Sequence, residues 1–129
     1  MPRGAPAILA AVAAGVLTAA GAGCTHTTAV LPYPREQVWQ AALAETVIWR
    51  PRIDEDDFTI ASRRIGLGEE EVEYELKLRA EPSLPSRPKT RVYVRIRQTK
   101  PKTERFVQEE KYFLMKLQAT LEQMGKTGM

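Results

Sequence analysis

Strict alternation of apolar and charged residues between positions 71 and 81 constrains the fold of this chain more than any other feature. A period of two over eleven residues indicates a β-strand with one buried and one solvated face. A second alternating run, at 91–97, follows a proline-rich loop that cannot join a ladder. The two runs are therefore expected to pair as an antiparallel hairpin. The apolar positions of the first run are Val72, Tyr74, Leu76, Leu78 and Ala80.

The two alternations also predict the register of this hairpin. Apolar residues must lie opposite apolar residues, so that paired positions share parity. One such register sets Glu75 opposite Arg95 and Glu73 opposite Arg97. A register shifted by two residues would set Lys77 opposite Arg95, which is a like-charge clash. We therefore predict the first register.

Two segments show the spacing of amphipathic helices. The first begins after Pro34 and ends at Arg50-Pro51, because the residue before a proline is pushed out of the helical region. The second is expected to begin at an N-cap on Thr103 and to end at Gly125. Its predicted seam consists of Phe106, Val107, Glu110, Phe113, Leu114, Leu117, Leu121 and Met124.

A weakly alternating stretch at 58–62 supplies one more predicted strand. The elements together predict an α+β two-layer sandwich, a three-stranded antiparallel meander with two helices on one face, in the order α-β-β-β-α. This domain spans residues 34–125, and residues 126–129 are expected to form a flexible tail. A chain of 129 residues supports one such domain with a modest core.

The N-terminal segment has the features of a targeting signal. Arg3 precedes a run without charges from Ala5 to Gly23, and the run is too short and too weakly apolar to span a bilayer. A basic start, an apolar centre and small residues before a cleavage site describe a secretory signal peptide, here residues 1–23. The only cysteine of the chain, Cys24, follows directly.

The sequence Ala20-Gly-Ala-Gly-Cys24 resembles the lipobox of bacterial lipoprotein precursors, although Gly21 stands where that family usually has Leu. The resemblance implies that the Cys24 thiol receives diacylglycerol, that the signal is removed before it, and that the new amino group is acylated. Two alternatives remain: ordinary secretion with cleavage after Ala22, and an uncleaved buried helix. A lone thiol in an oxidising compartment favours lipidation.

Residues 24–33 are polar and then punctuated by proline, so we expect a tether between the lipid and the domain. His26, the only histidine, lies in this tether and is expected to be solvated. In the lipoprotein family an acidic residue after the cysteine often retains the protein in the inner membrane. Thr25 is not acidic, so the resemblance implies a membrane-anchored protein of the cell envelope at the outer membrane, facing the periplasm.

The sequence contains no nucleophile elbow, phosphate-binding loop, dinucleotide fingerprint or zinc-protease motif. The glutamates of 69–75 could form a glycosidase pair, but cross-strand pairing with arginine accounts for them. The acids of 54–57 could suggest calcium, yet the sixth position from Asp54 is Thr59, where a calcium loop needs glycine. We therefore expect no enzyme activity, no catalytic residue, no metal and no cofactor.

The charged residues of the hairpin are the candidate binding residues. Basic side chains gather at and after the last strand, which could suggest nucleic acid, anionic lipid or a solvated face. The neighbouring strand is acidic and would repel phosphates, so we expect a protein partner and no nucleic acid. The candidate partner-binding residues are Glu73, Glu75, Arg91, Arg95 and Arg97.

The segment Tyr33-Pro-Arg-Glu-Gln-Val-Trp-Gln-Ala-Ala-Leu43 resembles the first helix of two groups. One comprises small helix-plus-sheet domains of envelope lipoproteins, including accessory lipoproteins of the outer-membrane barrel-assembly machinery. The other is the helix-grip lipid-binding superfamily, which needs a longer sheet than three strands. The first resemblance implies scaffolding or binding of an envelope protein partner. The alternative function is a carrier of a small hydrophobic ligand or lipid in the periplasm.

Overall fold

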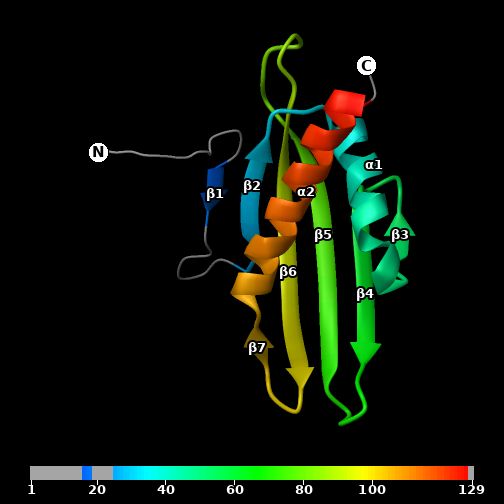
Figure 1. Cartoon of the computed structure of the whole chain (residues 1–129). Coiled ribbons are helices and arrows are strands. Elements are labelled where there is room, and N and C mark those ends of the chain that lie inside the picture. Colours follow the sequence, from blue (N-terminus) through cyan, green and yellow to red (C-terminus); the bar gives the residue numbers. More distant parts are fainter. Residues whose placement is uncertain (1–15, 19–24, 128–129) are drawn as a thin grey trace.

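A computed structural model of the chain describes residues 16–18 and 25–127. Within them, the backbone forms one antiparallel sheet in the order β1-β2-β6-β5-β4-β3, with β7 paired to β6 (Figure 1). The strands are β1 (Val16–Thr18), β2 (Thr27–Leu31), β3 (Arg52–Asp54), β4 (Thr59–Ile65), β5 (Glu71–Glu81), β6 (Lys89–Lys100) and β7 (Glu104–Arg105). The helices are α1 (Arg35–Thr46), the 3-10 turn η1 (Val47–Trp49) and α2 (Val107–Thr127).

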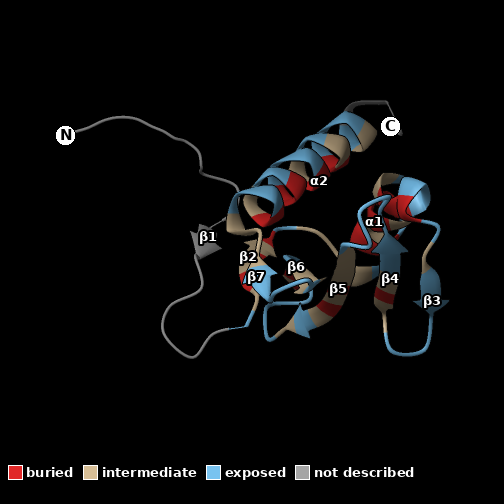
Figure 2. Ribbon diagram, turned by 90° about the horizontal axis from the view of Figure 1, so that it is seen from below, coloured by how far each residue is buried: buried red, intermediate tan, exposed pale blue. Residues whose placement is uncertain are grey.

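The predicted three-stranded meander in the order α-β-β-β-α is wrong. The described part of the chain forms a seven-stranded sheet, and a strand precedes the first helix. Both helices lie on one face of this sheet, as the view along it shows (Figure 2). The strands that the sequence analysis missed are short, and short strands leave little alternation to detect.

β2 lies in the segment that we expected to be a tether. Its inward side chains are Thr27, Ala29 and Leu31, each at most 1% exposed. Threonine and alanine are weakly apolar, so their alternation with Thr28 and Val30 does not show a buried side. Residues 27–31 are therefore part of the folded domain, paired along β6.

The predicted register of the central hairpin is confirmed. β5 and β6 pair with Glu75 opposite Arg95 and Glu73 opposite Arg97. The same register puts Leu76 opposite Val94 on the side that faces the helices, and both are fully buried. Parity of the apolar positions, together with the exclusion of a like-charge pair, was therefore sufficient to align the two longest strands.

Side chains from both layers fill the space between helices and sheet. α2 contributes leucines at helical spacing, and β5 and β6 contribute Leu76, Leu78, Val92 and Val94. Each of these residues is at most 1% exposed, so the two layers are in direct contact across the interior. The leucines of α2 are Leu114, Leu117 and Leu121.

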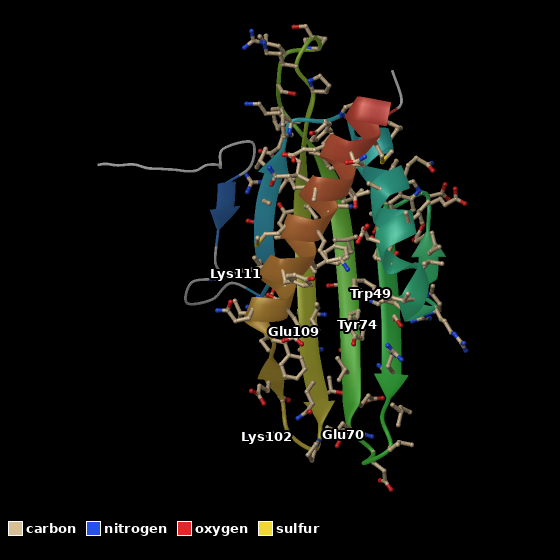
Figure 3. All side chains as sticks on the ribbon, viewed as in Figure 1. Trp49, Glu70, Tyr74, Lys102, Glu109 and Lys111 are labelled. Atoms are coloured by element: carbon tan, nitrogen blue, oxygen red, sulfur yellow. The ribbon has the colours of Figure 1, made fainter. Side chains whose placement is uncertain are left out.

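The first helix ends close to the predicted stop, and its last turn closes one side of the core. Trp49 lies between Tyr74 of β5 and Phe113 of α2, with ring centroids 4.8 and 5.2 Å away (Figure 3). Trp49 is 7% exposed, so it is a packing residue. The Ser62 hydroxyl donates to its carbonyl oxygen at 2.7 Å and ties this turn to β4.

The second helix begins at Val107 and not after an N-cap at Thr103, because the chain first pairs back onto β6 as β7. This detour places Arg105 beside Glu110 of the first helical turn. The Phe106 N–H donates to the Ile96 carbonyl at 2.8 Å, which fixes where the helix leaves the sheet.

Glu110, which the sequence analysis counted in the apolar seam, is fully buried as a carboxylate. The Thr27 hydroxyl donates to its Oε1 at 2.6 Å, and the Ile96 N–H donates to its Oε2 at 2.8 Å. The Arg105 guanidinium donates to both oxygens. One side chain of α2 thus holds β2, β6 and β7 together.

Replacing Glu110 by glutamine should destabilise the domain by about 1–3 kcal/mol, because the amide nitrogen that replaces one oxygen cannot accept the buried hydrogen bonds from Thr27, Ile96 or Arg105. Glu109→Gln, one residue earlier and exposed, is the matched control and should change little. The measurement is urea unfolding of both variants. Equal stability of the two variants would show that Glu110 does not hold the strands.

Candidate functional site

The sheet face opposite the helices carries the candidate binding residues. We call it the polar face and define it by His26, Arg63, Glu73, Glu75, Arg95 and Arg97. These side chains come from β4, β5, β6 and the residue that precedes β2, so they cross the centre of the sheet. The two glutamates are 21% and 23% exposed, which makes the face half-buried and not fully solvated.

Glu73 is the centre of one ion-pair group. Arg97 of β6 donates to Glu73 Oε1 from Nε at 3.1 Å, and its Nη2 lies 3.0 Å from the same oxygen. Arg63 of β4 donates to Glu73 Oε2 at 2.8 Å from the other side. Because each carboxylate oxygen has its own arginine, the group spans three adjacent strands.

Glu75 is the centre of a second group. Arg95 lies 3.4 Å from Glu75 Oε1, and His26 Nε2 lies 2.8 Å from the same oxygen. The ring of His26 also contacts Tyr93 edge-on, with centroids 6.1 Å apart. The expectation of a solvated histidine is therefore wrong: the side chain of His26 is 17% exposed and bound to the sheet. His26 directly precedes β2, and the pairing of β2 with β6 brings its side chain onto the sheet.

Arg91, the remaining predicted binding residue, lies toward the other end of the same strands. In the register it is opposite Arg79, but it reaches the neighbouring Glu81 with two hydrogen bonds of 3.0 and 3.1 Å. The hydrogen bonds that Arg91 donates to Glu81 raise the pKa of Arg91. The structure thus separates Arg91–Glu81 from the two central groups.

The arginines hold both central glutamates in their charged form. Burial acts to raise the pKa of Glu73, but hydrogen bonds from Arg97 and Arg63 outweigh it, and the pKa lies below its ordinary value. Burial likewise acts to raise the pKa of Glu75, and the hydrogen bond with His26 and the charge of Arg95 lower it. A general acid at neutral pH needs a raised pKa, so neither glutamate has the environment of one.

These pKa directions give the sign of an acid effect on stability. A carboxylate whose pKa is lowered on folding stabilises the protein above its unfolded pKa, about 4.3, and the contribution is lost as pH falls through the folded value. Replacing Glu73 and Glu75 by glutamine should lower the unfolding free energy at neutral pH and weaken its decline on the acid side.

Thermal unfolding from pH 7 to pH 3 measures this effect, with Glu55→Gln in the exposed turn as control. Each pair should contribute about 0.2–1 kcal/mol at neutral pH. An acid decline as steep in the double variant as in the unchanged protein would rule out these pairs as its source.

Other sequence-based candidates have different outcomes. Among the described residues, no three His, Cys, Asp or Glu are placed to hold a metal ion. Within the same residues, no helix is long and apolar enough to cross a membrane.

Asp57 of the acidic turn accepts a hydrogen bond from Thr59 and faces Arg79, and both lower its pKa. Cys24 and most of the expected signal peptide lie outside the described residues.

No protein-family model matches the chain, and no curated protein compared with it is similar in sequence.

Proposed function

We propose that the chain is a lipid-anchored, non-enzymatic domain of the bacterial cell envelope that binds or scaffolds a protein partner through its polar face. The observation that carries this proposal is the row of paired charges across β4, β5 and β6, on a face that neither helix covers. The expected anchor is Cys24, in its lipobox-like context.

The state of these side chains favours a protein partner. Each is already held by a neighbour, so docking would cost little side-chain entropy. Arginine and tyrosine are enriched in the centres of protein interfaces, and Arg95, Arg97 and Tyr93 lie together here. Because positive and negative groups alternate across the strands, the face is complementary to a protein surface that carries charges of both signs rather than to a polyanion.

A carrier of a small hydrophobic ligand is the second candidate. The objection that a helix-grip fold needs more than three strands no longer holds, because the described sheet is larger. The interior is nevertheless filled by side chains from α2, β5 and β6, such as Leu117 and Leu76, at 0% exposure. This packing favours the binding domain over the carrier.

The structure changes the expected distance between anchor and domain. Thr27, the first residue of β2, is three positions after Cys24, so this stretch of chain spans at most about 10 Å. Cleavage before Cys24 would also remove β1, which pairs with β2 through Val16–Thr18. The proposed mature protein thus carries β2 as its edge strand, close to the bilayer.

Cys24→Ala should abolish labelling by a fatty-acid analogue and release the protein from membranes, because no other thiol is present. Thr25→Ala is the matched control and should remain labelled. Labelling is followed in cells, and membrane retention by fractionation. Retention and mass that stay the same in Cys24→Ala would exclude the lipid anchor.

The partner surface can be tested with a photo-crosslinking amino acid at Tyr93, on the polar face. Tyr112, which is 62% exposed on α2, provides the control position on the opposite layer. We expect a discrete envelope-protein adduct from position 93 and none from position 112. If the adduct is lost when Glu73 and Arg97 are both reversed in charge, it is assigned to the polar face. Equal amounts of adduct from positions 93 and 112 would contradict the proposal.

A further inference from the structure

The end of the sheet where β4 and η1 finish has a chemistry different from that of the polar face. Arg50 and Arg64 are exposed there, and Arg52 is exposed beside them, opposite Ala61 in the register. The described residues provide no hydrogen bond or ion pair to these three side chains. Two adjoining hollows bring them together: Arg50 and Arg52 line one, and Arg50 and Arg64 line the other. Arg63 of the polar face lines both hollows, so the two surfaces adjoin. This concentrates uncompensated positive charge at one end of the molecule.

Apolar side chains lie among these arginines. Ile48 and Ile65 line the same hollow as Arg50 and Arg64, and they are 70% and 72% exposed. We define the arginine patch as Ile48, Arg50, Arg52, Arg64 and Ile65. Exposed apolar residues surrounded by cations are typical of surfaces that lie in the interface of an anionic bilayer.

The acidic side chains near the patch lie in the turns before and after β4. The acidic turn at 54–57 lies at the opposite end of β4, because Asp54 pairs with Thr59 at the start of that strand. Glu70, on the β4–β5 turn, lies at the same end of the molecule as Lys102 (Figure 3). Glu69 and Glu70 thus lie beyond the end of β4, and Lys102, in the β6–β7 turn, lies at that same end.

The register places the start of β2 at the same end. Thr27, Val94, Leu76 and Ile60 form one row across four strands. β4 runs opposite to β2, so Arg64, four residues after Ile60, lies about 13 Å from this row in the direction from which the chain enters β2.

Cys24 precedes Thr27 by three residues, so it lies within about 10 Å of that same row. A bilayer that holds the anchor is therefore within reach of the patch.

We propose that the arginine patch docks on anionic phospholipid headgroups. Guanidinium groups bind phosphate oxygens through paired hydrogen bonds, while Ile48 and Ile65 enter the interface. This inference rests on the proposed lipid anchor, which brings the patch to the membrane. Docking would stand the sheet on the bilayer and leave the polar face free for a partner.

The test uses the full chain with Cys24→Ser, so that one added cysteine carries an environment-sensitive fluorophore. The label replaces Ile48 in the patch or Leu84, which is 66% exposed in the loop between β5 and β6, as control. With vesicles of three parts phosphatidylcholine to one part phosphatidylglycerol, emission should shift to the blue at position 48 and not at 84. With phosphatidylcholine alone, neither label should shift.

Neutralising the arginines should remove the effect. Arg50→Gln, Arg52→Gln and Arg64→Gln together should abolish the shift and lower vesicle partitioning at least about tenfold. Arg87→Gln, Lys89→Gln and Lys111→Gln together remove the same charge elsewhere and should retain the shift. Should the arginine variant misfold, about 0.5 M NaCl on the unsubstituted protein should reverse the shift, because the charges are exposed.

Several results would overturn docking. The label at position 48 could stay exposed to water on both kinds of vesicle. Its emission could shift equally on vesicles of phosphatidylcholine alone. The shift could also stay the same in an arginine variant that folds. A water-exposed label combined with a photo-crosslink from position 48 to an envelope protein would assign the patch to a protein interface instead. Fatty-acid labelling of Cys24 in the unchanged protein reports the anchor separately, so failure of one claim leaves the other testable.

Discussion

The buried carboxylate of Glu110 is the interaction on which the arrangement of this domain depends. It accepts hydrogen bonds from Thr27 of β2, from the backbone of Ile96 in β6 and from Arg105 of β7. A buried carboxylate is tolerated only when both of its oxygens accept hydrogen bonds, so the fold needs all three of these donors. The requirement fixes the start of α2, draws the chain back as β7 and holds β2 in the sheet. The polar face is built on that sheet.

How much of the structure could be predicted depends on where the apolar and charged residues separate cleanly. β5 and β6 alternate bulky apolar residues with charges, so their register and the pairs Glu73–Arg97 and Glu75–Arg95 followed from parity and from the avoidance of like-charge pairs. β2 buries threonine and alanine, whose side chains carry little hydrophobic signal, and its segment was interpreted as a tether. The strand is formed by its pairing with β6 and by the hydrogen bond from Thr27 to Glu110, and both partners are distant in the chain.

Parts of the candidate site were hidden for the same reason. His26 joins Glu75 only because β2 brings it beside β6, and no local pattern shows this. The arginine patch combines residues of η1, β3 and β4, which are adjacent only after the sheet forms. Arg91, by contrast, lies where the alternation predicted but pairs diagonally with Glu81, since the residue directly opposite is another arginine. Sequence periodicity thus identified which residues share a face of a strand. The neighbours of residues at strand ends and sheet edges could be found only from the structure.

The proposed functions divide the molecule into three surfaces. The helices fill one face of the sheet and supply the core. The polar face carries paired charges suited to a protein partner, and the end that bears the arginine patch is suited to the bilayer. These roles are compatible because the expected anchor enters β2 from that same end, which orients the sheet away from the membrane.

The proposed roles depend most on β2 being an integral strand that begins three positions after Cys24, the expected anchor. Amide hydrogen exchange of the protein tests this most directly. We expect slowly exchanging amides within Thr27–Leu31, with protection approaching that of the β6 residues opposite them, 90–94. Exchange throughout 27–31 at the rate of an unstructured chain, with β6 still protected, would show that this segment is a tether and would contradict the account.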